Sequence, residues 1–131
     1  MPDGSKDWYA LRNAVYAGKF VEAEELFKSN PSLLTTTNSI GETVLHFLAV
    51  ENDVNGVTWL RARGFDINTK NQFGTPVVFE VAQLEYKDLF LWFASNGADL
   101  RTHDAKGMDI FEYLNEYGKV EMAEWVQQHV T

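Results

Sequence analysis

The sequence contains no cysteine, only three histidines, and fewer basic than acidic residues. Without a thiol, the chain has no disulfide, no thiolate zinc site and no cysteine nucleophile. No apolar run approaches the ~18 residues that a membrane-spanning helix needs. The opening MPDGSKDW lacks the basic and apolar segments of a signal peptide. We therefore expect no membrane association and a cytoplasmic location, or the cytosol of a host cell.

The charge balance is negative, with 11 Lys and Arg against 19 Asp and Glu and a formal net charge of −8. Such a field repels nucleic acid and attracts basic partners. Because the basic residues are scattered, the sequence predicts no groove for nucleic acid. Residues 104–131 hold six acidic and two basic residues. Both a solvated, soluble surface and the selection of a basic partner explain this acidic end.

Motifs that carry chemistry are missing as well. The sequence has no H-E-x-x-H, P-loop, G-x-S-x-G or glycine-rich dinucleotide turn. His46, His103 and His129 lie far apart along the chain, and no carboxylate pattern links them. Spacing alone does not exclude a glycosidase-like pair of carboxylates, but no motif supports one. We therefore predict a protein with no enzymatic activity, cofactor or metal.

The clearest pattern that is present is a period of 33 residues, which Gly41, Gly74 and Gly107 show. Other residues return in the same phase: Leu45, Val78 and Phe111; Trp59, Trp92 and Trp125; Ala49 and Ala82; Gly64 and Gly97; Asp66 and Asp99. A repeat of this length indicates a solenoid of stacked helical units. The 131 residues, 45% of them apolar, suffice for a single domain, 1–131.

Each unit has the same expected local structure. We predict helices at about 45–51 and 55–62 in one unit, and at about 78–84 and 87–95 in the next. Thr43 is expected to cap a first turn with its hydroxyl, and Pro76 to occupy one. Gly64 and Gly97 are expected to end the second helices. The segment 65–73 alternates and turns, which predicts a hairpin-like finger.

Three motifs carry a family resemblance: Gly41-Glu42-Thr43-Val44-Leu45-His46-Phe47-Leu48-Ala49, Gly64-Phe65-Asp66-Ile67-Asn68 and Gly97-Ala98-Asp99-Leu100-Arg101. The pattern resembles the ankyrin repeat, with its G-x-T-P-L-H-x-A-A and G-A-D-V-N signatures. The third unit departs from it, because Phe79 fills the histidine slot and the Thr-Pro pair is shifted. The fourth keeps the spacing but loses both the Thr and the His.

The resemblance covers about residues 5–130. It implies a mainly α solenoid of about four units, each a helix-turn-helix with a hairpin finger, at about 5–37, 38–70, 71–103 and 104–131. It also implies a structural hydrogen-bond network that joins His46 to Thr43 and to loop backbone. Trp59, Trp92 and Trp125 are expected to form a packed ladder between units. Gly56, inside a predicted helix, is expected to permit a close contact.

In the ankyrin family, fingertips and first helices form one concave partner surface. Ile40 and Phe73 share a fingertip column, although turns normally carry polar residues there. Leu84 and Tyr117 share a second column, and Met108 extends the apolar strip. The polar residues predicted beside the strip are Glu42, Glu51, Lys70, Gln72, Lys106 and Glu116. The alternative is that Phe73 packs onto the next finger.

These observations favour a monomeric, non-enzymatic protein–protein interaction module that binds a basic protein partner through this surface. One specific version is an inhibitor, or an immunity protein that covers a basic toxin. The alternative is an adaptor or host-factor mimic that bridges two proteins, which requires two separate surfaces.

Overall fold

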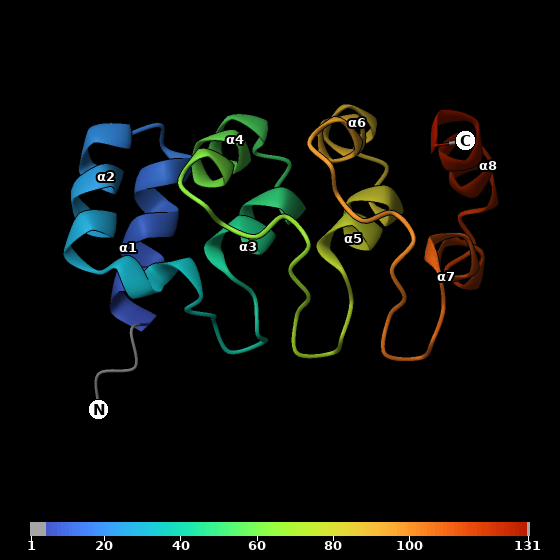
Figure 1. The fold of residues 1–131 in the computed structure, drawn as a ribbon, viewed down its shortest axis with the longest axis horizontal. Helices are drawn as coiled ribbons and strands as arrows, with labels where there is room; N and C mark the ends of the chain where they lie inside the picture. The colour runs from blue at the N-terminus through green and yellow to red at the C-terminus, as the bar shows by residue number, and fades with distance from the viewer. Residues whose placement is uncertain (1–4, 131) are drawn as a thin grey trace.

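The computed structural model describes residues 5–130 and is all-helical over that range (Figure 1). Its eight α-helices are α1 (Ser5–Tyr16), α2 (Phe20–Ser29), α3 (Val44–Val50), α4 (Val54–Ala62), α5 (Val77–Gln83), α6 (Lys87–Ser95), α7 (Ile110–Glu116) and α8 (Val120–Val130). A 3₁₀ helix, η1 (Pro31–Leu34), follows α2. Residues 5–130 contain no strand, and one isolated bridge joins Lys70 to Pro76. The expected hairpin fingers are therefore loops.

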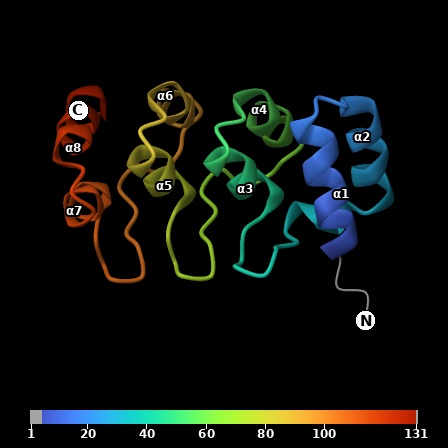
Figure 2. The same cartoon turned by 180° about the vertical axis from the view of Figure 1, so that it is seen from behind.

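Consecutive helices form four pairs that stand side by side in chain order, as two opposite views show (Figures 1 and 2). Each helix contacts its pair partner, and α1, α3, α5 and α7 also contact one another in sequence. The loops that enter α3, α5 and α7 project to the same side of the row. We call these loops, residues 35–43, 68–76 and 101–109, the fingers.

The core lies between neighbouring pairs, and the first helices occupy its centre. α3 and α5 each have only seven residues, and five of the seven are buried in both helices. A helix of two turns is unstable by itself in water. Helices α3 and α5 therefore depend on packing against the pairs on both sides.

The helix ends follow the sequence closely. The Thr43 hydroxyl accepts the backbone N–H of His46 at 3.2 Å, which confirms the predicted cap. At the equivalent place in α7, Asp109 forms a capping box with Glu112. Pro76 is the residue before α5 and not part of its first turn, so that prediction is wrong by one position. Gly64 has a φ of 96°, as expected for a glycine that ends a helix.

The tryptophan column lies at the edge of the core. Trp59 stacks on Phe20 of the preceding pair, with ring centroids 5.7 Å apart, and Trp125 meets Phe90 of its preceding pair at 5.7 Å. The three column residues pack against the core but are only half-buried, so the predicted ladder between units is found at the edge of the core and not in its centre. Their helices form the outer row, which has neighbours on fewer sides. The fully buried indole is Trp8, whose N–H donates to the Glu42 carbonyl at 3.1 Å.

Gly56 permits a close contact, as expected, with the Asp53 side chain and with α1. A Cβ at this position would overlap Asp53 Oδ2 and would lie 3.0 Å from Val15 Cγ1 of α1. Asp53 caps α4 by accepting the Gly56 N–H at 3.0 Å. Its other oxygen is buried without a partner, and burial raises the pKa of the Asp53 carboxyl. The glycine leaves room for this capping carboxylate.

The 33-residue glycine column has two physical causes. Gly41, Gly74 and Gly107 all have a φ of 77–79°, a backbone region that favours glycine. In addition, a Cβ on Gly41 would lie 2.5 Å from the Gln72 backbone nitrogen in the next finger, and one on Gly74 would lie 2.7 Å from Ala105 Cβ. A Cβ on Gly107 would meet nothing within 4 Å. The last finger thus needs glycine for its backbone alone.

Gly41→Ala should therefore destabilise the protein more than Gly107→Ala. Both variants carry the cost of a left-handed backbone, about 1–2 kcal/mol, but only Gly41→Ala also overlaps the next finger, which adds about 1–3 kcal/mol. Urea unfolding followed by circular dichroism measures both variants. Equal losses of unfolding free energy in the two variants would contradict this prediction, because the close approach of the fingers would then contribute nothing to stability.

Arg63 joins the first two pairs on their outer row. Its guanidinium lies 3.8 Å from the centre of the Trp59 ring and 2.6 Å from Glu24 Oε1. The hydrogen bond from Arg63 lowers the pKa of the Glu24 carboxyl below 4.5. This pairing therefore favours the folded state above about pH 4.5, and the contribution is lost as pH falls through the lowered pKa.

Arg63→Gln should return the pKa of Glu24 to its ordinary range, because the charged donor is removed. An NMR titration of the Glu24 side-chain carbonyl in both proteins measures this. Glu25, a neighbour on α2, provides an internal reference. An unchanged Glu24 titration would mean that Arg63 does not hold this carboxylate in solution.

Candidate functional site

The fingers share one turn that the sequence analysis overlooked. Asn38, Asn71 and Asp104 recur at the 33-residue period, and the Oδ1 atom of each accepts two backbone N–H groups of its own finger. In the last finger, Asp104 accepts from Lys106 and Met108, both at 2.9 Å. Asn and Asp side chains stabilise turns in this way. The recurrence of Asn or Asp every 33 residues in the sequence was the signal that could have identified these turn residues.

Neighbouring fingers are also bonded to each other. The Gln72 backbone N–H donates to the Ile40 carbonyl at 3.0 Å, which ties the first finger to the second. Lys70 Nζ donates to the His103 carbonyl at 3.1 Å, which ties the second to the third. Side chains at the fingertips are therefore presented from a connected row of turns.

Four of the five apolar residues predicted for a partner surface are exposed. The exposed fractions are 40% for Ile40 and 63% for Phe73 in the fingers, and 42% for Leu84 and 53% for Tyr117 after the first helices. The alternative in which Phe73 packs onto the next finger is therefore wrong. The predicted polar residues that are also exposed are Glu51, Lys70, Gln72, Lys106 and Glu116.

Two of the predicted surface residues are not exposed. Glu42 is 5% exposed, because its side chain turns inward to accept a hydrogen bond from Asn38 Nδ2 at 3.1 Å. The prediction of Glu42 as part of an exposed rim is therefore wrong. Met108 is half-buried and packs against the core.

The exposed residues form two groups and not one strip along the chain. Phe73 precedes α5, whereas Leu84 follows it, so a helix of seven residues separates them. At 1.5 Å per residue this is roughly 10 Å. We name Ile40 and Phe73 the finger patch, and Leu84 and Tyr117 the helix-end patch. Tyr117 is held there by its contact with the Tyr113 ring, at a centroid distance of 4.8 Å.

Exposed aromatic residues on α1 were missed by the sequence analysis. Tyr9 and Tyr16 are 41% and 60% exposed, and Arg12 lies over the Tyr9 ring at 4.9 Å. A pocket between α1 and α3 is lined by Tyr16, Arg12 and the predicted residue Glu51. The spacing from the first unit to the second is about one residue longer than the 33-residue period. The period therefore does not show which α1 residues correspond to the columns of the later units.

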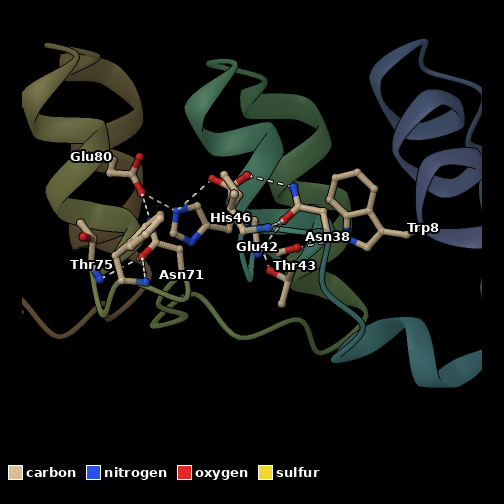
Figure 3. Close-up of polar contacts among 10 residues, drawn as sticks. Trp8, Asn38, Glu42, Thr43, His46, Asn71, Thr75 and Glu80 are labelled. Atoms are coloured by element: carbon tan, nitrogen blue, oxygen red, sulfur yellow. Dashed lines mark hydrogen bonds and ion pairs between the residues drawn. The ribbon is translucent and has the colours of Figure 1, made fainter. Parts of the chain in front are cut away.

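A polar group is buried behind the fingers, and we call it the Glu42–His46–Glu80 cluster. The His46 side chain is 0% exposed and lies between the two carboxylates (Figure 3). Its Nε2 atom is 2.6 Å from Glu80 Oε1 and 3.7 Å from Glu42 Oε2. Glu42 directly precedes the Thr43 cap of α3, and Glu80 comes from α5, so the cluster crosses the boundary between the second and third pairs.

The network predicted for His46 is correct only in part. Its backbone N–H donates to Thr43, but its ring forms a hydrogen bond with the Glu80 side-chain carboxylate and not with loop backbone. The other ring nitrogen, Nδ1, is buried without a partner. Asn71 Nδ2 donates to Glu80 Oε1 at 3.2 Å, so the finger turns support the cluster. Imidazole and carboxylate groups in such proximity can share a proton or bind a divalent cation.

Asp104→Ala should loosen the last finger, because two backbone N–H groups lose a charged acceptor. The expected loss of stability is about 1–3 kcal/mol. Asp104→Asn is the matched control, because Asn38 and Asn71 form the same turn in the other fingers. Hydrogen exchange should become faster at the Lys106 and Met108 amides in the Ala variant and stay slow in the Asn variant. Unchanged exchange in both variants would contradict the role assigned to Asp104.

Comparison with known proteins adds no assignment: no protein-family model matches the chain, and no curated protein matches it. Over residues 5–130, none of the helices has the length and apolar character needed to cross a membrane. The basis for a function is therefore the chain's own repeat, its exposed patches and its buried cluster.

Proposed function

We propose that the chain is an ankyrin-type solenoid of about four units and acts as a protein-binding module without chemistry of its own. Four helix pairs in a row, each later pair entered by a finger with the same Asn or Asp turn, support this fold. The thirty-three-residue period and the ankyrin-like motifs around Gly41, Gly64 and Gly97 support it independently.

The observation that carries the binding role is the exposure of Phe73, at 63% on a fingertip. A tight turn does not need an apolar ring, and the ring does not pack into the core. The neighbouring finger adds Ile40, and hydrogen bonds between the fingers fix their spacing. Large side chains presented by a rigid scaffold lose little entropy on binding and are typical centres of protein interfaces.

The net charge of −8 favours a basic partner. Glu51, at the end of α3, and Glu116, which directly precedes Tyr117 of the helix-end patch, are both exposed. An acidic module that covers a basic surface would act as an inhibitor of that surface, and an immunity protein is one such case. Association with such a partner should slow as salt is raised, because charge steers the encounter.

The separation of the finger patch from the helix-end patch favours a second candidate, an adaptor that bridges two proteins. An adaptor needs two surfaces, and the two patches lie at opposite ends of α5. The two roles make different predictions for single variants in each patch.

The test is affinity capture from the source organism with immobilised wild-type protein and with Phe73→Ala, Tyr117→Ala and the double variant. We expect one stoichiometric basic protein, whose affinity falls at least ~10-fold in the double variant if these residues are interface anchors. Val21→Ala is the matched control, because Val21 is 79% exposed on α2, away from both patches. Circular dichroism confirms that each variant is folded.

The outcomes separate the alternatives. Loss of one protein with Phe73→Ala and of a different one with Tyr117→Ala would establish the adaptor. Retention of the partner by the folded double variant would overturn the surface assignment. Capture of an acidic partner, insensitive to salt, would overturn the electrostatic part of the proposal.

A further inference from the structure

We propose that the Glu42–His46–Glu80 cluster is a binding site for a divalent metal ion of the zinc class. Each residue offers one donor atom, and the three donors lie within 4.8 Å of one another. They are an imidazole nitrogen and two carboxylate oxygens, which zinc and its neighbours in the first transition row accept. This inference does not rest on the proposed protein-binding role.

The distances suit a small ion. Zinc bonds to nitrogen and oxygen are about 2.0–2.2 Å, so donors in a tetrahedral site lie roughly 3.4 Å apart. His46 Nε2 is 3.7 Å from Glu42 Oε2 and 2.6 Å from Glu80 Oε1. An ion would draw the first pair slightly together and part the second by under about 1 Å, and it would hold the two carboxylate oxygens, which lie within 4.8 Å of each other, at a similar separation. The Glu80 side chain is partly exposed, and we expect its rotation to supply this movement.

The charge of the cluster is not balanced by the protein. With a proton on each ring nitrogen, one imidazolium faces two carboxylates and leaves a net charge of −1. Over residues 5–130, neither carboxylate forms an ion pair with a lysine or arginine. The Glu42 side chain is only 7% exposed, and burial of an uncompensated charge is costly. A divalent cation bound to the neutral imidazole makes the cluster neutral.

One of the three candidate ligand atoms, a carboxylate oxygen of Glu42, also accepts no hydrogen bond within residues 5–130. Glu42 Oε1 accepts from Asn38 Nδ2, but Glu42 Oε2 has only the 3.7 Å approach to His46 Nε2, which is too long for a hydrogen bond. The Glu42 side chain is more than nine-tenths buried, its Oε2 keeps some access to solvent, and this oxygen points toward the other two ligand atoms (Figure 3). An ion between the three donors would satisfy it.

The surroundings support two of the three ligands. Asn38 holds Glu42, and Asn71 holds Glu80, through hydrogen bonds of 3.1 and 3.2 Å. Carboxylates that bind metals are usually oriented by such bonds. His46 Nδ1 lacks the corresponding partner, and the protein supplies only three ligands. We therefore expect a moderate affinity, with water completing the coordination on the side of Glu80, whose side chain is 22% exposed.

The consequence of binding is a bridge between the second and third helix pairs. Glu42 and His46 belong to α3 and its finger, whereas Glu80 belongs to α5. An ion that binds only when these pairs are stacked stabilises the folded protein by mass action. Metal would thus act on the boundary that presents the Ile40 and Phe73 fingertips.

The experiment uses the full chain after treatment with EDTA and dialysis. Isothermal titration with ZnCl2 and thermal unfolding with and without ZnCl2 are measured for wild type, Glu80→Gln and His103→Gln. We expect one zinc ion per chain and a higher Tm in wild type, at least ~10-fold weaker binding in Glu80→Gln, and no change in His103→Gln. His103 is the matched control, because it is an exposed histidine of the last finger.

A second measurement needs no variant. Titration of wild type with ZnCl2 should shift the ¹⁵N resonance of His46 Nε2, whereas those of His103 and His129 stay in place. Absence of zinc binding by wild type overturns the proposal, as does equal binding by folded Glu80→Gln. A zinc-dependent shift confined to His103 or His129 also overturns it.

Discussion

Packing between neighbouring helix pairs is the interaction on which the rest of the structure depends. The first helices have seven residues in the last three pairs, far too few to be stable in isolation. They persist because α3 is enclosed between α1 and α5, and α5 between α3 and α7. Every other feature is placed by this stacking: which indole is buried, how closely the fingers approach, and which polar groups face one another across a boundary.

The fingers show how stacking converts a local turn into a connected surface. Each turn is closed by an Asn or Asp side chain and by a glycine with positive φ. The spacing of the pairs then brings each finger against the next, so that Gly41 and Gly74 also have no space for a side chain. Exposed apolar residues such as Phe73 are therefore held by a rigid row, which is a favourable arrangement for recognition.

The polar cluster has a different origin, because it is not part of the repeat. The residues that follow His46 in its column are Phe79 and Glu112, and those in the column of Glu80 are Phe47 and Tyr113. Within residues 5–130, a histidine and two carboxylates come together only at the boundary between the second and third pairs. A feature that occurs once in a repeating scaffold is set by the individual side chains and not by the fold. This distinguishes the proposed metal site from the general stabilisation of the row.

The sequence alone determined the features that depend on residue type and on the 33-residue period. Capping at Thr43, the helix stop at Gly64 and the bounds of α6 follow from residue type and spacing, and each is found where it was predicted. The exposure of Phe73 also follows from its place in a fingertip column. Such features require only neighbours along the chain or the phase of the repeat.

Only the tertiary structure decided which side chains are buried and which of them contact a neighbouring helix pair. It turned Glu42 inward, left Trp59 half-buried at the outer row and buried Trp8. It also brought Glu80 to His46, 34 residues away in sequence, at 2.6 Å. The physical reason is that a period gives the order of the units but not their separation or rotation. Burial and side-chain contact between units depend on those two quantities.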